Sequence, residues 1–139
     1  MSYDLILRQA LKLHDEGRLD EAERLYRQIL ETAPDHPVVL NLLGLVAQSK
    51  GLHEQAVSFF ARAVEQNPQS AEYHFNLAWS EERRGKAAEA IKAYLRALQL
   101  QPGIKEARNA LGNLYAGLGQ TERAREQYNP VSYTHLRAH

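Results

Sequence analysis

The chain has 139 residues, and its 17 basic residues balance 17 acidic ones without a cluster of either sign. This balance argues against a nucleic-acid interface and against a polybasic membrane-binding patch. The chain has no cysteine, which excludes disulfides and thiolate metal sites. It also has no apolar stretch of the length that a signal peptide or a membrane span needs, and we therefore expect a cytoplasmic protein.

A period of 34 residues runs through the chain. Five columns of like residues recur at this step: glycines (Gly17, Gly51, Gly85, Gly119), alanines (Ala22, Ala56, Ala90, Ala124), aromatic residues (Tyr26, Phe60, Tyr94, Tyr128), prolines (Pro34, Pro68, Pro102) and small residues (Ala10, Gly44, Ala78, Gly112). A fixed period of this length is typical of stacked helical hairpins, which work by presenting a long surface. In chain order, the columns predict repeats at 3–36, 37–70 and 71–104, a truncated fourth repeat at 105–129 and a tail at 130–139.

The third repeat shows how each unit is built. Tyr73, Leu77 and Ala78 at helical spacing predict a first helix up to its basic end at Arg83 and Arg84, where Gly85 can take the left-handed conformation that closes a helix. A second helix is predicted from about Ala87, and Pro102 prevents it from continuing. The second helices of the three full repeats are expected to end at Thr32, Gln66 and Leu100.

Small residues mark the place where the two helices of a repeat cross. In the third repeat these residues are Ala78 and Ala90, which would let the two helices approach closely. Tyr94 is expected to fill the space toward the next repeat. The first repeat is looser, because the polar Gln9 stands in a column that is otherwise leucine, as expected of a terminal unit.

The pattern fails after Tyr128. Asn129 and Pro130 are expected to end the helix about one turn earlier than in the other repeats. The residues that follow, VSYTHLRAH, have no counterpart in the earlier repeats and resemble a translated sequencing-library adapter. We expect the residues from about Pro130 to be non-native and the gene to be cut within the fourth repeat; a native unstructured tail is the alternative.

The stretches NLAWSEERRGKAAEAIKAYLRALQLQP and ALGNLYAGLGQTERAREQY resemble the tetratricopeptide repeat family. The resemblance covers about residues 3–128 and rests on the period together with its five columns. It implies an all-α fold, a right-handed superhelical solenoid of antiparallel helix pairs with three full repeats and a truncated fourth. It also implies that the first helices line a concave groove, which in this family binds peptides or partner proteins.

Under this resemblance, the groove is lined by the outward-facing residues of the first helices. These residues are Leu7, Leu11, Asn41, Leu42, Leu45, Phe75, Asn76, Trp79, Glu106, Asn109 and Asn113. Trp79 is the only tryptophan, and such an aromatic residue can dominate partner binding; alternatively, it packs on an adjacent first helix beside Leu45. The four asparagines could bond the backbone of an extended peptide, or be ordinary solvated residues.

We expect partner binding on the part of the groove where the fold does not need the bulk of the side chains. The residues assigned to it are Asn41, Leu42, Leu45, Phe75, Asn76, Trp79, Asn109 and Asn113. A cationic clamp for a peptide carboxylate is not expected, because the positions that would carry it are not basic: Leu7, Glu72 and Asn76 in one register, and Asn41, Glu106 and Ala110 in the next. An extended segment or an amphipathic helix fits better.

The uncapped fourth repeat predicts a second kind of association. Arrays of this kind normally finish with a polar capping helix, so Leu111, Leu114 and Tyr115, together with Tyr128, are expected to be partly exposed and to favour self-association.

Catalytic chemistry is not indicated. The six histidines lack metal-ligand spacing, and the chain has neither a phosphate-binding glycine loop nor a nucleophile elbow. We expect no cofactor, no metal and no enzyme activity in this segment. The alternative is the N-terminal, substrate-recruiting repeat region of a larger glycosyltransferase, sulfotransferase or methyltransferase. YRQILETAPDHPVVLNLLGLVAQSKG together with YHFNLA resembles bacterial chains of that kind, and a catalytic domain would then follow residue 129.

Overall fold

The structure, a computed structural model, describes residues 3–128. Over this range the regular structure consists of helices alone, which confirms the all-α class. In chain order they are α1 (Tyr3–Asp15), α2 (Leu19–Thr32), α3 (Pro37–Ser49), α4 (His53–Gln66), α5 (Ala71–Arg83), α6 (Ala87–Leu100), α7 (Lys105–Gly117) and α8 (Thr121–Tyr128). Each predicted repeat contains one pair of helices, whereas the suspected adapter sequence lies outside the described residues.

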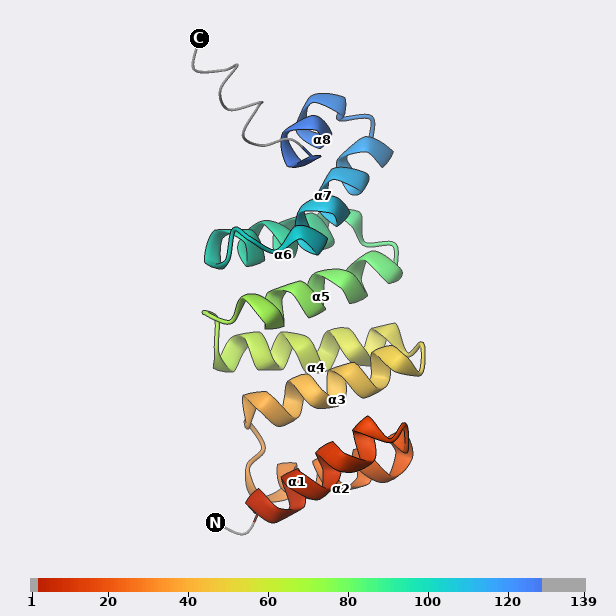
Figure 1. The fold of residues 1–139 in the computed structure, drawn as a ribbon, viewed down its shortest axis with the longest axis vertical. Coiled ribbons are helices and arrows are strands. Elements are labelled where there is room, and N and C mark those ends of the chain that lie inside the picture. The colour runs from red at the N-terminus through yellow and green to blue at the C-terminus, as the bar shows by residue number, and fades with distance from the viewer. Residues whose placement is uncertain (1–2, 129–139) are drawn as a thin grey trace. The chain divides into compact units, whose positions relative to one another are not determined.

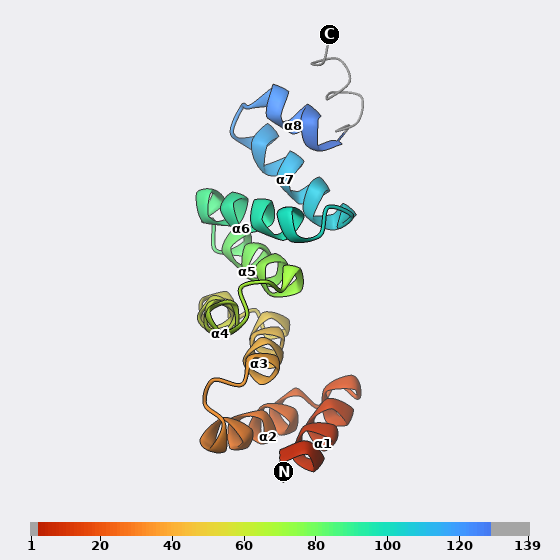
Figure 2. The ribbon, with the colours of Figure 1, turned by 90° about the vertical axis from the view of Figure 1, so that its left-hand side faces the viewer.

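The chain divides into two compact units, residues 1–69 and 70–139. In the first unit α1 packs on α2 and α3 on α4, and α2 contacts α3 (Figure 1). The second unit repeats this arrangement with α5 on α6, α7 on α8, and α6 against α7 (Figure 2). Every unit is thus two helical hairpins joined through the second helix of the earlier hairpin. The right-handed superhelix that the resemblance implies for the whole chain stays a prediction.

The turn inside each hairpin is built on the glycine column. Gly85 has a φ of +78°, and the glycines at the three equivalent positions also have φ between +75° and +80°. The Gly85 amide donates to the carbonyl of Glu82, and the next amide, of Lys86, donates to Glu81. This pair of bonds is the Schellman arrangement, which satisfies the last carbonyls of a helix and needs a left-handed residue. The predicted role of Gly85 is confirmed.

The connection between hairpins follows the proline column. Helices α2, α4 and α6 end at Thr32, Gln66 and Leu100, as predicted, two residues before each proline. The next first helix then begins on a side-chain cap in two repeats. The Val39 amide donates to Nδ1 of His36 at 3.4 Å, and the Tyr73 amide donates to Oγ of Ser70 at 3.2 Å. Side-chain acceptors at this position satisfy amides that a helix start leaves unpaired.

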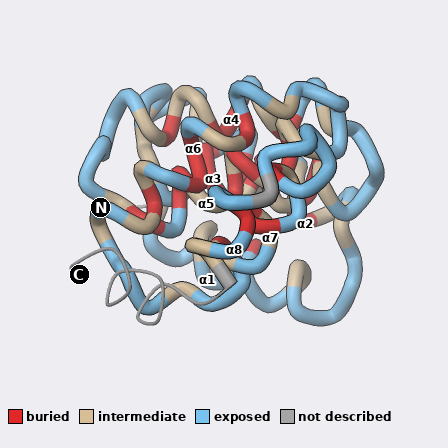
Figure 3. Tube along the Cα trace, turned by 90° about the horizontal axis from the view of Figure 1, so that it is seen from above, coloured by how far each residue is buried: buried red, intermediate tan, exposed pale blue. Residues whose placement is uncertain are grey.

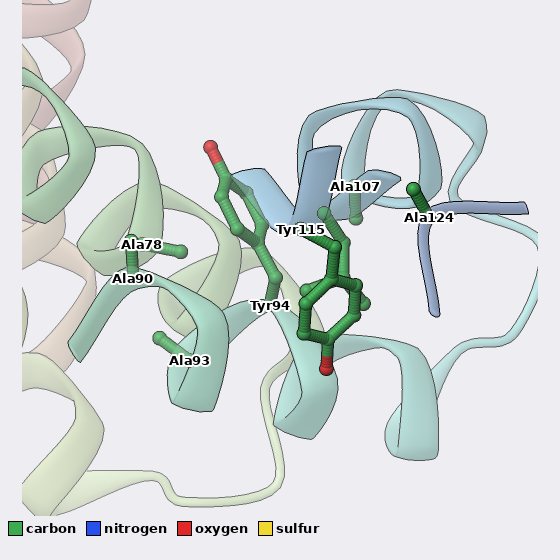
Figure 4. Packing of buried hydrophobic residues seen from close by; sticks show 8 residues of the cluster. Ala78, Ala90, Ala93, Tyr94, Ala107, Tyr115 and Ala124 are labelled. Carbon is green, nitrogen blue, oxygen red and sulfur yellow. The ribbon is translucent and has the colours of Figure 1, made fainter. Parts of the chain in front are cut away.

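The core of the second unit lies between its two hairpins. Figure 4 shows Tyr94 and Tyr115 at its centre, with Ala78, Ala90 and Ala93 on one side and Ala107 and Ala124 on the other. Ala78, Ala90 and Tyr94 have no exposed surface. The small residues at the crossing therefore leave room for the ring, as the alanine column predicts.

The first unit uses a still closer contact at the same place. A Cβ atom added to Gly44 would lie 2.8 Å from Cζ of Phe60, and nearer still to two other atoms of that ring. Phe60 is fully buried and cannot move away without disturbing its neighbours. Figure 3 colours the chain by burial and shows that the buried stretches lie within the helices and the exposed ones in the turns between them.

The expected exposure of the fourth repeat is wrong for two of its residues. Leu111 and Tyr115 are buried, because α7 packs on both α6 and α8, and Leu114 is half-buried. Leu118, in the turn after α7, is the large apolar residue that remains exposed in this repeat within the described range, at 52 %.

Candidate partner-binding surface

The strongest candidate surface lies on α5, in the second unit. Phe75 and Trp79 are one helical turn apart, and Arg83 follows one turn later, so the three side chains share a side of the helix. Trp79 is half-buried. The guanidinium carbon of Arg83 lies over the indole, 4.4 Å from the ring centroid, which is well within the range of a cation–π interaction. We call Trp79 and Arg83 the Trp79–Arg83 pair.

Phe75 does not belong to this surface in the way that the sequence suggested. Its ring meets the ring of Tyr94 edge to face, with 5.7 Å between the centroids, and it packs on the buried cluster of the second unit. The expectation that the fold does not need the bulk of Phe75 is therefore wrong. Trp79 differs, because it is not among the side chains that pack on this cluster within the described residues.

The four predicted groove asparagines fall into two groups. Asn41 on α3 is 5 % exposed and Asn76 on α5 is 8 % exposed, so both are buried rather than presented to solvent. Asn109 and Asn113 lie on α7 and are exposed. Asn41 stands inside the apolar run VVLNLLGLV, a signal that could have indicated its burial from the sequence. The four asparagines are therefore not equivalent, and a peptide-binding role of the α7 pair stays a prediction.

The remaining predicted residues lie in the first unit. Leu42 and Leu45 on α3 are half-buried, as is Leu7 on α1, while Leu11 is exposed. A single groove that joins these leucines to the Trp79–Arg83 pair stays a prediction.

The acidic neighbours of the Trp79–Arg83 pair are already engaged. The hydroxyl of the buried Tyr94 donates to Oε1 of Glu82 at 2.8 Å, and burial together with this carboxylate raises the pKa of Tyr94 well above its usual range. Tyr94 therefore stays a neutral donor. Arg84 forms an ion pair of 2.9 Å with Glu81. Arg83 has a looser ion pair, 3.9 Å from Glu82, and 43 % of its side chain is exposed.

Arg83 was missed by the sequence analysis. The positions considered for a cationic clamp lie in the first two turns of the first helices, whereas Arg83 is at the last position of α5 and was taken only as part of the basic end of that helix. The signal that could have found it is the spacing of four residues from Trp79, which brings two side chains together on a helix.

A second charged cluster stabilises the first unit. Nζ of Lys50, just after α3, lies 3.0 Å from Glu23 on α2 and also contacts Asp20. The hydrogen bond from Lys50 lowers the pKa of Asp20. Partial burial opposes ionisation of Glu23, but bonds from Lys50 and Arg27 outweigh it and lower its pKa as well. These carboxylates already have partners, so this cluster joins α2 to the end of α3 rather than forming a site.

Two further features bear on the chemistry available. Within residues 3–128, no group of three or more histidine or acidic side chains is arranged to hold a metal ion. Over the same range, no helix has both the length and the apolar character needed to cross a bilayer.

The comparisons with known proteins agree with the hairpin array. Profiles described as tetratricopeptide repeat match residues 13–78, 71–104 and 93–126. Human Superkiller complex protein 3 is 31 % identical over 130 residues, which is 89 % of this chain and 8 % of that protein. The TPR repeat-containing thioredoxin TTL4 of Arabidopsis thaliana is 33 % identical over 82 residues, or 59 % of this chain and 12 % of that one. The chain thus spans a small part of the curated relatives that it matches.

Solved structures show the same fold. A crystal structure of MamA protein superimposes with a TM-score of 0.86 at 26 % identity, covering 91 % of this chain and 69 % of that chain. An O-GlcNAc transferase variant of Thermobaculum terrenum gives a TM-score of 0.74 at 29 % identity, covering 81 % of this chain and 22 % of that one.

The fold and the periodic sequence define a helical-repeat protein built from antiparallel hairpins. The chain belongs to the tetratricopeptide repeat family, on the evidence of profile matches that together extend from residue 13 to residue 126.

Proposed function

We propose that this segment is a non-catalytic scaffold that binds a protein or peptide, and that Trp79 on α5 is the anchor of the binding surface. The observation that carries the proposal is the position of Trp79. Trp79 is half-buried, is not among the described residues of the packed cluster of its unit, and lies under an arginine that is itself partly exposed. Tryptophan and arginine are the residues that most often dominate protein interfaces.

The partner that fits this surface is a protein segment. An indole offers a large apolar face to a side chain, and the exposed Asn109 and Asn113 in the same unit offer amide donors and acceptors. The net charge of zero supports neither nucleic acid nor an anionic membrane as the partner. A cytoplasmic location is part of the same proposal.

Substitution of Trp79 tests the proposal. Short random peptides displayed on phage are selected on the full chain, and their affinity is measured for Trp79→Ala and for Lys92→Ala, a control at an exposed position of α6. Trp79→Ala should lose about 2 kcal/mol of binding free energy, as expected of an anchor, while Lys92→Ala binds as the wild type does. Equal affinities, with helix content intact in both variants, would show that Trp79 is not the anchor.

A second candidate function is supported by two of the similar proteins. The match to this chain covers 22 % of the chain of an O-GlcNAc transferase variant and 12 % of a TPR repeat-containing thioredoxin. In this reading the segment recruits substrates to a catalytic domain elsewhere in a longer protein. It uses the same surface, so the intact gene at the source locus decides between the two: a catalytic domain in the same reading frame would favour the second.

Self-association through the fourth repeat stays a prediction of the sequence. Fewer apolar side chains than expected support it, because Leu111 and Tyr115 are buried; among the described side chains of this repeat Leu114 is half-buried and Leu118 is exposed.

A further inference from the structure

We infer that the Trp79–Arg83 pair recognises a carboxylate that stands next to an apolar side chain in the partner segment. The inference rests on the proposed function and assigns a chemical class to the partner, an acidic peptide segment. It is carried by the geometry of Arg83 rather than by that of Trp79.

The guanidinium of Arg83 is positioned but not satisfied. It lies over the indole, 4.4 Å from the ring centroid, and the ring restricts the orientations that the long side chain can adopt. A guanidinium has five N–H donors, yet within residues 3–128 Arg83 makes no hydrogen bond. Its ion pair of 3.9 Å is too long to be one.

The carboxylate beside Arg83 is shared with Tyr94. Glu82 accepts a bond of 2.8 Å from the Tyr94 hydroxyl, and the buried Tyr94 ring is fixed in the core of the unit. The other oxygen of Glu82, Oε2, lies 3.9 Å from the guanidinium of Arg83, so Glu82 bonds Tyr94 closely and Arg83 only loosely. Arg84, the next residue, shows the contrast, because its guanidinium donates to Glu81 at 2.9 Å.

A pre-positioned arginine with unused donors suits a carboxylate. The planar fork of N–H groups matches the two oxygens of a carboxylate, and such paired, charge-assisted bonds are among the stronger ones in proteins. The indole beneath the guanidinium offers an apolar face next to the charge. An aspartate, a glutamate or a terminal carboxylate adjacent to an apolar residue would use both parts of the pair at once.

The acidic residue at the other end of α5 does not oppose this. Glu72 lies eleven residues before Arg83, which is about 16 Å along a helix axis and beyond the screening length at physiological salt. Glu72, whose negative charge disfavours a carboxylate clamp in the first turn of α5, is thus remote from the Trp79–Arg83 pair.

The experiment uses the peptides selected on the full chain. Each acidic residue or terminal carboxylate of a selected peptide is replaced by its amide, and binding is measured for the wild type, for Arg83→Gln and for the matched control Arg84→Gln. The carboxylate-to-amide change should weaken binding to the wild type and to Arg84→Gln about tenfold. The same change should hardly affect binding to Arg83→Gln, which lacks the guanidinium that would bind the carboxylate.

The two proposals fail in different ways. Two results would overturn the carboxylate inference and leave the proposed function standing. In the first, the selected peptides need Trp79 but show no preference for acidic residues. In the second, the carboxylate-to-amide change weakens binding to Arg83→Gln as much as binding to the wild type. If no peptide is selected, or if none loses affinity with Trp79→Ala, both proposals are overturned.

Discussion

The hydroxyl of Tyr94 donates a hydrogen bond of 2.8 Å to the carboxylate of Glu82, which lies twelve residues earlier on the first helix of the same hairpin. The first repeat has the equivalent contact, 2.8 Å between Tyr26 and Nδ1 of His14. The second repeat has Phe60 at this position, without a hydroxyl. The ring therefore fills the crossing in each of these three repeats, while in two of them the hydroxyl also forms a hydrogen bond between the two helices.

Removal of the Tyr94 hydroxyl should weaken the second unit without disturbing its packing. Tyr94→Phe keeps the ring, which Phe60 shows to be compatible with the crossing, and loses one hydrogen bond to a charged acceptor. We expect a loss of about 1.5 kcal/mol in the free energy of unfolding, measured by urea denaturation. An unchanged midpoint would mean that water replaces the bond at no cost.

A larger residue at the crossing should destabilise the array by overpacking. Ala90 is fully buried against the core of the second unit, whereas Ala88 on the same helix is exposed. Ala90→Leu is expected to cost about 1–3 kcal/mol, and Ala56→Leu should do the same in the first unit. The control Ala88→Leu should leave thermal unfolding nearly unchanged. Equal melting temperatures for the Ala90 and Ala88 variants would disprove the close crossing.

The hairpin turn should not tolerate a side chain. Gly85 has a φ of +78°, a region that costs an ordinary residue about 1–2 kcal/mol. Gly85→Ala should lower the free energy of unfolding by that amount, although a Cβ at this position meets no atom within 4 Å. Gly103 has equal space but no positive φ, so Gly103→Ala should be neutral or slightly stabilising. A neutral Gly85→Ala would contradict the turn geometry.

The ion pairs of Lys50 predict a pH dependence for the first unit. The pKa values of Asp20 and Glu23 are lowered in the folded state, from ordinary values of 3.8 and 4.5. Their contribution to stability is therefore fully present above these values and is lost as the pH falls through the lower folded ones. Lys50→Met should be less stable than the wild type at neutral pH, and the difference should vanish in acid.

The control for this prediction is Lys86→Met. Lys86 is exposed and forms no ion pair within the described residues, so its loss should not change the acid dependence. A difference between wild type and Lys50→Met that persists at low pH would point to lost packing of the lysine stem instead.

The repeat pattern predicts those features that local chemistry decides. A left-handed residue closes the first helix wherever the glycine column falls, and a proline ends the second, so Gly85 and Pro102 are sufficient to place the hairpin. The crossing could be predicted too, because the columns that contain Ala78 and Ala90 hold alanine or glycine in every repeat.

The burial and the contacts of residues outside the columns depend on which other helix covers them. The helical spacing that assigns Phe75 and Asn76 to an outward face does not reveal that Phe75 meets Tyr94 or that Asn76 is covered. The hydrogen bond from Tyr94 to Glu82, next to Arg83, is likewise a contact between helices. The sequence therefore indicates which helix carries the candidate surface, but it does not reveal the contacts that decide the chemistry of that surface.

Trp79 is the only tryptophan in the chain, so its fluorescence reports on the candidate surface alone. The most direct test of the account is a titration of the full chain with a tryptophan-free peptide selected on it, in parallel with calorimetry. We predict a saturable change in Trp79 emission with the same dissociation constant as the calorimetric one, in the wild type and in Lys92→Ala alike. Calorimetric binding that leaves the Trp79 emission unchanged would contradict the assignment of this surface as the partner-binding site.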